Sequence, residues 1–275
     1  MCFSGSPERR SAPILVQLGE KSEYGRKRWL HTAASGLRAF ALLLLSEMFR
    51  LRVDWFWYLV QMSFQPLALL TFVFFLWGDP RAAQFAVTGS LVVTMSSSAM
   101  LSLGQYIGWM KSVNTYEHYA ALPISRTVFL AAIGTRGVLL SLPSLLTVAV
   151  IGSLVMDVHF TAQSVVVLLL GAYAMSGLGA FIGFWSRDAQ VSSLATQVLA
   201  TIIIFLAPVY IPVERLPGPL QVTAKAIPTT YVARALRLTV SGAPISSLWP
   251  DMAVLAVLAL VSLFLVPLRV PWRQN

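Results

Sequence analysis

Six stretches of the chain are apolar enough and long enough to cross a lipid bilayer as helices. A membrane-crossing helix needs about 20 mostly apolar residues, and in lipid the backbone has to satisfy its own hydrogen bonds, as a helix does. The pattern therefore predicts an all-helical (all-α), polytopic integral membrane protein, with the membrane domain over residues 55–268. The six predicted spans are Trp55–Trp77, Ala82–Ile107, Val128–Met156, Ser164–Trp185, Val191–Ile211 and Trp249–Leu268.

The segment before the first span, residues 35–54, has a different pattern. Its charged residues Glu47, Arg50 and Asp54 lie away from an apolar stripe at helical spacing. A helix of this kind is typical of the headgroup layer, so we expect an amphipathic interfacial helix here; the alternative is a continuous extension of the first span. The stripe consists of Leu37, Phe40, Ala41, Leu44, Met48 and Leu51.

Composition agrees with a membrane protein and excludes several other classes. The chain of 275 residues is 57% hydrophobic and 11% charged, whereas a soluble domain carries about 25% charged residues. The same apolar content excludes intrinsic disorder. A disulfide scaffold is excluded because Cys2 is the only cysteine.

The net charge of +9 indicates orientation rather than nucleic-acid binding, because Lys and Arg collect on the cytoplasmic side of membrane proteins. With the predicted spans, 14 Lys and Arg lie on one side and five on the other, with Arg136 inside a span left uncounted. We therefore expect both termini in the cytoplasm, as tails of residues 1–34 and 269–275, in a multi-pass protein of the cell (plasma) membrane. No cleavable signal peptide is expected, since the first apolar run begins after roughly 30 polar and charged residues.

Two connections are long enough to carry function. The cytoplasmic one, residues 108–127, contains a helix-compatible stretch at 113–122. The external one, residues 212–247, opens with prolines that are incompatible with a regular helix, but its residues 229–238 have amphipathic helical spacing. This pattern favours a re-entrant hairpin that dips into the membrane; the alternative is a plain external loop.

Residues for enzymatic chemistry are missing from the sequence. None of the four lysines follows a glycine, so there is no phosphate-binding GxxxxGK[ST] loop. The three histidines are scattered, and no catalytic or metal-ligating spacing occurs. We expect no enzymatic activity and no directly bound cofactor or metal. Gly179 and Gly183 indicate close helix packing. Arg136 is interpreted either as a snorkelling or ion-paired residue or as a contact for substrate or coupling.

Three segments carry a resemblance to a known family. They are Phe205–Gln221 (FLAPVYIPVERLPGPLQ), Ile227–Arg237 (IPTTYVARALR) and Tyr116–Arg126 (YEHYAALPISR). With the basic tail, the interfacial helix and six spans, the chain resembles over essentially its whole length the membrane (permease) subunits of type-2 ATP-binding-cassette (ABC) exporters.

The resemblance implies partners and site residues. A second permease subunit, the same or related, would complete the path, and separate ABC ATPase subunits would use ATP and Mg. The interfacial helix would also touch the ATPase. Glu117 would belong to the coupling helix; the alternative is an exposed acid that caps a loop. The implied residues are Tyr116, Glu117 and His118 for ATPase coupling, Phe64, Gln65, Thr201 and Phe205 for the path, and Pro217, Pro228 and Tyr231 for the hairpin.

Short outer loops indicate a drug-like or amphipathic natural product as cargo. A polysaccharide or glycolipid exporter of the same family is the alternative. An ion-coupled secondary transporter is the alternative from another class, although it would typically show inverted repeats and charges near the midplane, and neither is visible. Partners other than the ATPase, the second permease and membrane lipid are not expected, and nucleic acid is not among them.

Overall fold

The computed structural model describes residues 36–49, 80–115, 119, 124–206 and 217–269, with scattered positions between 56 and 75. These residues form helices and turns without a strand, which confirms the all-helical prediction. Four described helices are long and apolar enough to cross a membrane, at Ala83–Ser112, Arg126–Met156, Ala162–Trp185 and Ile245–Ser262. They correspond to the second, third, fourth and sixth predicted spans. About half of the first predicted span, Trp55–Trp77, and residues 207–211 of the fifth lie outside the described residues.

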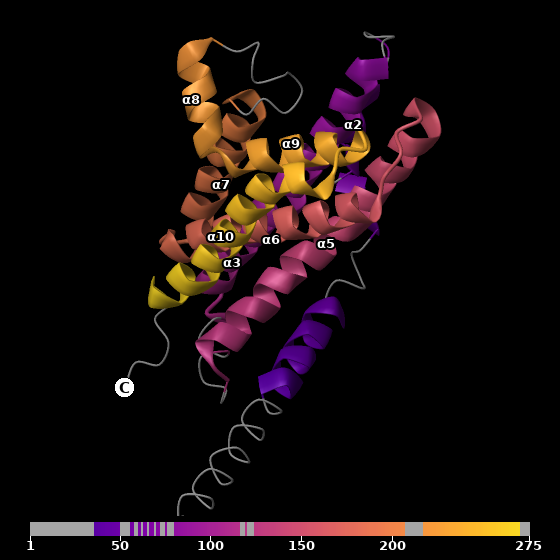
Figure 1. Ribbon diagram of the computed structural model, residues 1–275. Helices are drawn as coiled ribbons and strands as arrows, with labels where there is room; N and C mark the ends of the chain where they lie inside the picture. The colour runs from indigo at the N-terminus through magenta and orange to yellow at the C-terminus, as the bar shows by residue number, and fades with distance from the viewer. Residues whose placement is uncertain are drawn as a thin grey trace, which may run out of the picture.

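The labelled elements follow one another along the chain from Pro80 onwards (Figure 1). They are α2 (Pro80–Met95), the π-helix η1 (Ser96–Leu101), α3 (Ser102–Ser112), α5 (Arg126–Met156), α6 (Ala162–Trp185), α7 (Ala189–Leu206), α8 (Gly218–Ala226), α9 (Pro228–Val240) and α10 (Ile245–Arg269). A further helix, which we call the N-terminal helix, covers residues 36–49.

Local side-chain chemistry sets the ends of these helices. The hydroxyl of Ser125 accepts from the N–H of Val128 and caps the start of α5. Asp157, with φ of 53°, ends α5 in the left-handed conformation, and Thr161 and Ser164 form a capping box at the start of α6. Gly242, with φ of 73°, follows α9 and provides the left-handed residue that helix ends favour.

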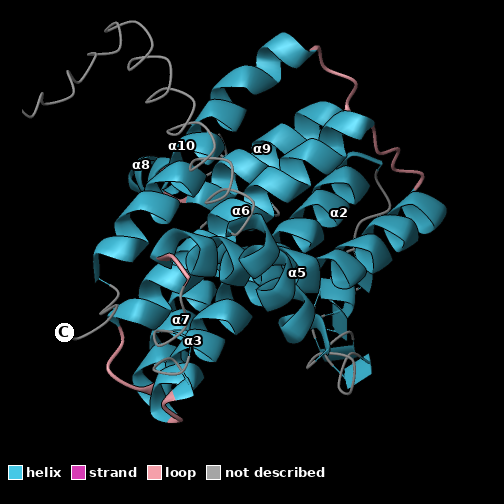
Figure 2. Ribbon diagram, turned by 90° about the horizontal axis from the view of Figure 1, so that it is seen from below, coloured by secondary structure: helices cyan, strands magenta, loops and turns pink. Residues whose placement is uncertain are grey.

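α6 lies at the centre of the bundle and contacts α3, η1, α5, α9 and α10; Figure 2 shows it between α9 and α10 on one side and α3 and α7 on another. A side chain added at Gly179 would come closer than 3.0 Å to the carbonyl of Met100, and one at Gly183 would do the same at the carbonyl of Gly104. α6 therefore meets η1 and α3 backbone against backbone. This confirms the packing role predicted for Gly179 and Gly183.

The N-terminal helix differs from its predicted orientation. A Cβ on Gly36 would lie 3.7 Å from Val128, and Glu47 contacts Arg136, so the helix runs alongside the first turns of α5 and in the same direction. Glu47 is 2% exposed, whereas Leu37 is 70% exposed. The carboxylate that lies away from the apolar stripe is therefore buried, although an interfacial helix was expected to keep its charged residues in the headgroup layer. The carboxylate faces the bundle because the guanidinium of Arg136 lies there as its counter-charge. Residues 50–54 lie outside the described part.

The two long connections also differ from their predicted form. α3 continues to Ser112, so the cytoplasmic connection begins later than residue 108, and Asn114, with φ of 54°, makes a turn where a helix was expected to begin. In the external connection, the helix predicted at 229–238 is confirmed as α9. α8 was not predicted; it begins next to Pro219, a residue that the first helical turn tolerates.

α9 lies along the N-terminal half of α6 (Figure 1). The Ser164 hydroxyl donates to the Thr239 hydroxyl at 2.9 Å, and a Cβ on Gly171 would lie 3.0 Å from Val232. The two helices are therefore antiparallel neighbours over at least seven residues, or about 10 Å of helix. Val232, Ala233, Ala235 and Leu236 of α9 are fully buried.

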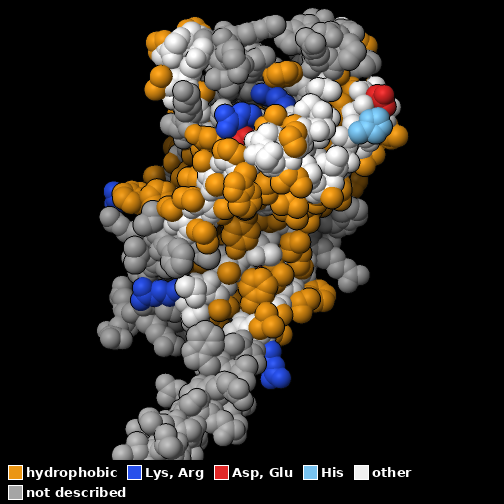
Figure 3. All heavy atoms as spheres, viewed as in Figure 1, with side chains coloured by type: hydrophobic (Ala, Val, Ile, Leu, Met, Phe, Trp, Pro, Cys, Tyr) orange, Lys and Arg blue, Asp and Glu red, His pale blue; other side chains and the backbone are white. Residues whose placement is uncertain are grey.

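Apolar side chains cover most of the outer surface of the described bundle, and Figure 3 shows them as a broad band across the middle of one face. The exposed positions include Leu146, Val150 and Leu154 on α5 and Val257, Leu260 and Val261 on α10. Exposed apolar patches of this extent are unusual for water-soluble monomers and suit contact with lipid.

Candidate functional site

A buried polar cluster joins four parts of the chain near the beginning of α5. It consists of Glu47 from the N-terminal helix, Tyr106 from α3, Tyr119 from the segment between α3 and α5, and Arg136 from α5. The Tyr106 hydroxyl donates to Oε2 of Glu47 at 2.7 Å, and the Tyr119 hydroxyl donates to Oε1 at 2.9 Å. Both carboxylate oxygens therefore have a partner.

Arg136 supplies the counter-charge. Its Nε lies 3.0 Å from Oε2 of Glu47, and the two side chains are only 5% and 3% exposed. The guanidinium carbon lies 3.7 Å from the centroid of the Tyr106 ring, a cation–π contact. Of the two interpretations of Arg136, the structure shows the ion pair. A buried pair of this kind is costly to break, because the remaining charge stays buried without compensation.

Tyr106 and Tyr119 extend the polar cluster into aromatic packing. Tyr106 stacks on Trp109, with ring centroids 5.9 Å apart and an interplanar angle of 22°. The Tyr119 ring lies 5.4 Å from that of Phe129 on α5. Through Tyr119, this segment therefore contacts the N-terminal helix and α5, and through Glu47 it is linked to Tyr106 on α3.

The end of α3 holds the turn between α6 and α7. The ammonium of Lys111 donates to the carbonyls of Phe184 and Ser186 at 2.5 Å and 2.8 Å, at the α6 C-terminus where cations are favoured. The Ser112 hydroxyl accepts from the N–H of Ala189, the first residue of α7, at 3.1 Å. α3 therefore connects the polar cluster to the start of α7.

α7 presents one face to α3 and leaves the other uncovered. Ser192 and Thr196 are fully buried against α3, and the Ser192 hydroxyl donates to the carbonyl of Gly104 at 2.7 Å. On the uncovered face, the Gln197 amide donates to the Ser193 hydroxyl at 2.9 Å, and Gln105 of α3 donates to the same hydroxyl at 3.3 Å. We call Gln105, Ser193, Gln197 and Thr201 the amide strip.

A second ion pair, between a buried carboxylate and a half-exposed guanidinium, lies at the opposite end of the bundle. Asp251 of α10 is fully buried, and the guanidinium of Arg234 on α9 bridges both of its carboxylate oxygens, with Nε 2.8 Å from Oδ2. Arg237 lies over the ring of Phe85 on α2, 4.1 Å from its centroid. α9 is therefore fastened to α10 and to α2.

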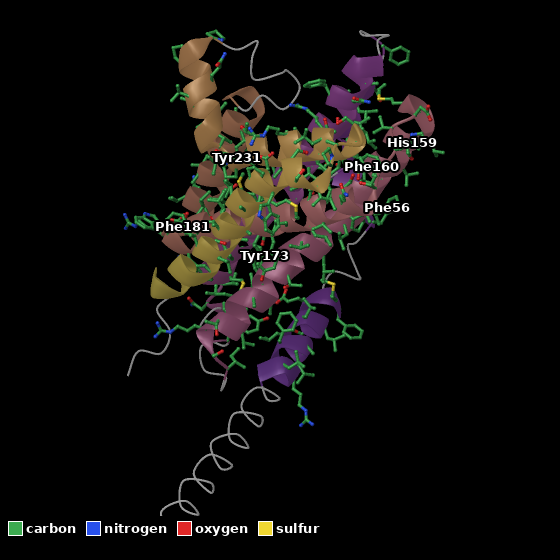
Figure 4. All side chains as sticks on the ribbon, viewed as in Figure 1. Phe56, His159, Phe160, Tyr173, Phe181 and Tyr231 are labelled. Carbon is green, nitrogen blue, oxygen red and sulfur yellow. The ribbon has the colours of Figure 1, made fainter. Side chains whose placement is uncertain are left out.

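The structure places some of the residues that the sequence singled out. Thr201 is exposed on α7, and Phe64 is 72% exposed. Pro217 precedes α8 and Pro228 begins α9. Tyr231 is half-buried on α9, where Figure 4 labels it, 5.8 Å from the guanidinium of Arg234. Phe205 lies in α7, but its side chain is outside the described part, as are Tyr116, Glu117, His118 and Gln65.

Sequence reasoning missed the polar cluster itself. Glu47 and Arg136 are opposite charges in strongly apolar surroundings, and such residues tend to pair inside membrane bundles. That rule could have suggested their contact. Tyr106 and Tyr119 had no such signal, because their role depends on how α3 and the following segment pack.

One comparison with known proteins identifies a family. The family model described as ABC2_membrane, ABC-2 type transporter, matches residues 38–240. The matched region includes every member of the polar cluster and of the amide strip. A search of curated proteins returned no match.

Breaking the buried ion pair from one side should destabilise the fold more than removing both partners. We expect Arg136→Met or Glu47→Gln alone to cost about 3–5 kcal/mol, because each leaves one buried group uncompensated, and the double variant to cost clearly less than the sum. Thermal unfolding in detergent measures this. Arg187→Met, which removes an exposed cation, is the control and should cost less than about 0.5 kcal/mol. If the destabilisation of the double variant equalled the sum of the two single variants, the energetic coupling between Glu47 and Arg136 would be contradicted.

Proposed function

The chain belongs to the ABC-2 type transporter family, and we propose that it is the membrane-spanning permease subunit of an ATP-driven exporter. In this proposal a second permease subunit, the same or related, completes the path. Separate ABC ATPase subunits bind on the cytoplasmic side and use ATP and Mg, while this chain contributes no catalytic group. The observation that supports the proposal most strongly is the polar cluster, because it connects a cytoplasmic segment to three helices of the membrane domain.

The proposed coupling begins in the segment that contains Tyr119. A bound ATPase displaces this segment when ATP draws the ATPase subunits together, with Tyr116, Glu117 and His118 at the contact. The displacement passes through Tyr119 to Glu47, then to α3 and α5. From α3 it reaches the α6–α7 turn through Lys111. Two alternating arrangements are sufficient, with ATP favouring one of them.

The proposed topology has six spans, with both termini in the cytoplasm, and residues 212–247 form an external re-entrant hairpin. The antiparallel course of α9 along about 10 Å of α6 supports the re-entrant form. The Arg234–Asp251 pair also supports it, because a fully buried carboxylate on α10 needs a counter-charge from the hairpin.

We propose that the uncovered face of α7 borders the path and that the cargo is a drug-like or amphipathic natural product. Apolar residues dominate this face, with Leu194 57% and Val198 58% exposed, and the sequence of α7 contains no charged residue. The amide strip offers neutral hydrogen-bonding groups beside them. Such a surface suits a molecule that is mostly apolar with a few hydroxyl or amide groups. The alternative, an anionic polysaccharide or glycolipid, would find no cation on this helix.

A pull-down from native membranes in mild detergent tests the partnership. We expect the wild-type chain to bring down an ATPase subunit and ATP hydrolysis, and Glu117→Arg to lower the recovery of that subunit at least tenfold while the membrane domain stays folded. Glu8→Arg, the same charge change in the N-terminal tail, is the control and should leave recovery within about twofold. A chain that is purified alone, yet moves a solute down an imposed ion gradient in liposomes, would refute the proposed function.

Labelling with an impermeant thiol reagent tests the topology. In a Cys2→Ser background, Lys225→Cys should react when the reagent is added outside intact cells, because the hairpin is external. Arg187→Cys, in the turn between α6 and α7, should react only after the membrane is opened. The opposite pattern would reverse the orientation of every span.

Stimulation of ATP hydrolysis by amphipathic compounds tests the cargo assignment in the reconstituted complex. We expect Gln197→Leu to raise the cargo concentration for half-maximal stimulation about fivefold, because one hydrogen bond contributes about 1 kcal/mol. Val166→Leu, an exposed position on α6, should leave it unchanged. Stimulation by anionic polysaccharide, or equal behaviour of both variants, would contradict the assignment.

A further inference from the structure

The longest helical run of the structure, from Pro80 to Ser112, is interrupted in the middle by the π-helix η1. At its end the N–H of Ser102 donates to the carbonyl of Ser97, five residues back. The flanking residues Met95 and Ser102 keep ordinary α-helical angles. Single π turns within α-helices are rare and occur frequently at functional sites.

Hydroxyl groups accompany this π turn along one side of the helix. Ser90, Thr94, Ser98 and Ser102 are four residues apart, and each of the last three donates to the carbonyl of the one before. The first two of these bonds measure 2.7 Å and 2.6 Å. Bonds of this type compete with the backbone ladder and bend helices. They also keep carbonyl groups satisfied while backbone N–H groups change partners, which an apolar interior requires.

The neighbouring helices leave room for the wider turn. Gly137 of α5 faces the carbonyl of Ala99, 3.4 Å from where its Cβ would be, and Gly179 of α6 faces that of Met100 even more closely. Glycine therefore borders η1 on two sides. Ser96, Ser97 and Ser98 themselves have small side chains and are buried. Three of the six residues of the turn therefore bring little side-chain bulk, while Met100 in its second half is large and fully buried.

The two arms on either side of η1 are attached to different parts of the protein. α2 is held by α9 through Arg237 over Phe85. α3 is held by the polar cluster through Tyr106 and by the α6–α7 turn through Lys111. If the end of α3 moves relative to the start of α2, the helix has to bend somewhere between these two points. Helix kinks concentrate at π turns.

We propose that Ser96–Leu101 is the bending joint of the transport cycle, at which α3 swings relative to α2 when the ATPase moves the cytoplasmic end. The inference rests on the proposed function, since it takes an ATPase as the source of the movement. Deleting one residue from a π turn turns it into a regular α-helix with the same flanking register. The joint can therefore be stiffened by deleting Ser97.

The experiment measures the distance between spin labels at Val113→Cys and Leu154→Cys, both exposed positions, in a Cys2→Ser background and in the assembled complex. With the joint intact, the distance distribution should shift between the nucleotide-free and the ATP-trapped complex. With Ser97 deleted, we expect this shift to disappear and transport to fall at least tenfold, while binding of the ATPase stays within about twofold. Ser97→Ala keeps the length of the chain and should behave like the wild type.

If the deletion variant still showed the shift in spin-label distance and transported normally, the bending joint would be overturned. The proposed function would stand in that case, because the variant would still bind the ATPase. Hydrogen exchange of the wild-type complex gives a second measurement that needs no variant. Amides in residues 96–102 should exchange faster during ATP turnover than those of α2 and α3, and equal protection throughout would also overturn the joint. A wild-type chain that binds no ATPase would instead refute the proposed function.

Discussion

The fold depends on the close approach of α6 to the long helix formed by α2, η1 and α3. Helices in lipid gain little from burying apolar surface against one another, so close packing of small residues has to hold them together. Gly179 and Gly183 let the backbones touch, and the Ser176 hydroxyl reaches the carbonyl of Gly134 on α5 at 2.9 Å. α5, α7, α9 and α10 each contact α6, and α5, α7 and α9 also contact the long helix.

Two ion pairs join neighbouring elements of the bundle, and only the first is buried on both sides. The Glu47–Arg136 pair attaches the N-terminal helix to α5, and the Arg234–Asp251 pair attaches α9 to α10. The two pairs lie toward opposite ends of the bundle, with the apolar belt between them. An ion pair needs defined geometry, so these contacts give the bundle fixed points in an otherwise apolar interior.

Helix positions could be read from the sequence because lipid imposes a simple rule on length and polarity. α5 and α6 begin within two residues of their predicted starts and end where predicted. What could not be read is which side of a helix faces the bundle, as in residues 36–49, where Glu47 is buried and Leu37 is exposed. The π turn could not be predicted from the sequence either, because Ser96–Ser98 fit a regular α-helix as well. The polar cluster could not be predicted because it brings together four segments that are distant in the sequence.

The Arg234–Asp251 pair also has a consequence for the synthesis of the protein. The two residues are 17 positions apart, and a ribosome adds about 5–20 residues per second. Arg234 therefore emerges roughly a second or more before the carboxylate that neutralises it. Until α10 is in place, Arg234 lacks this counter-charge, and α9 is held by its packing against α6 and α2. α10 thus completes the charge pairing of the helix before it, and a nascent chain that stops before residue 251 would leave Arg234 without this carboxylate.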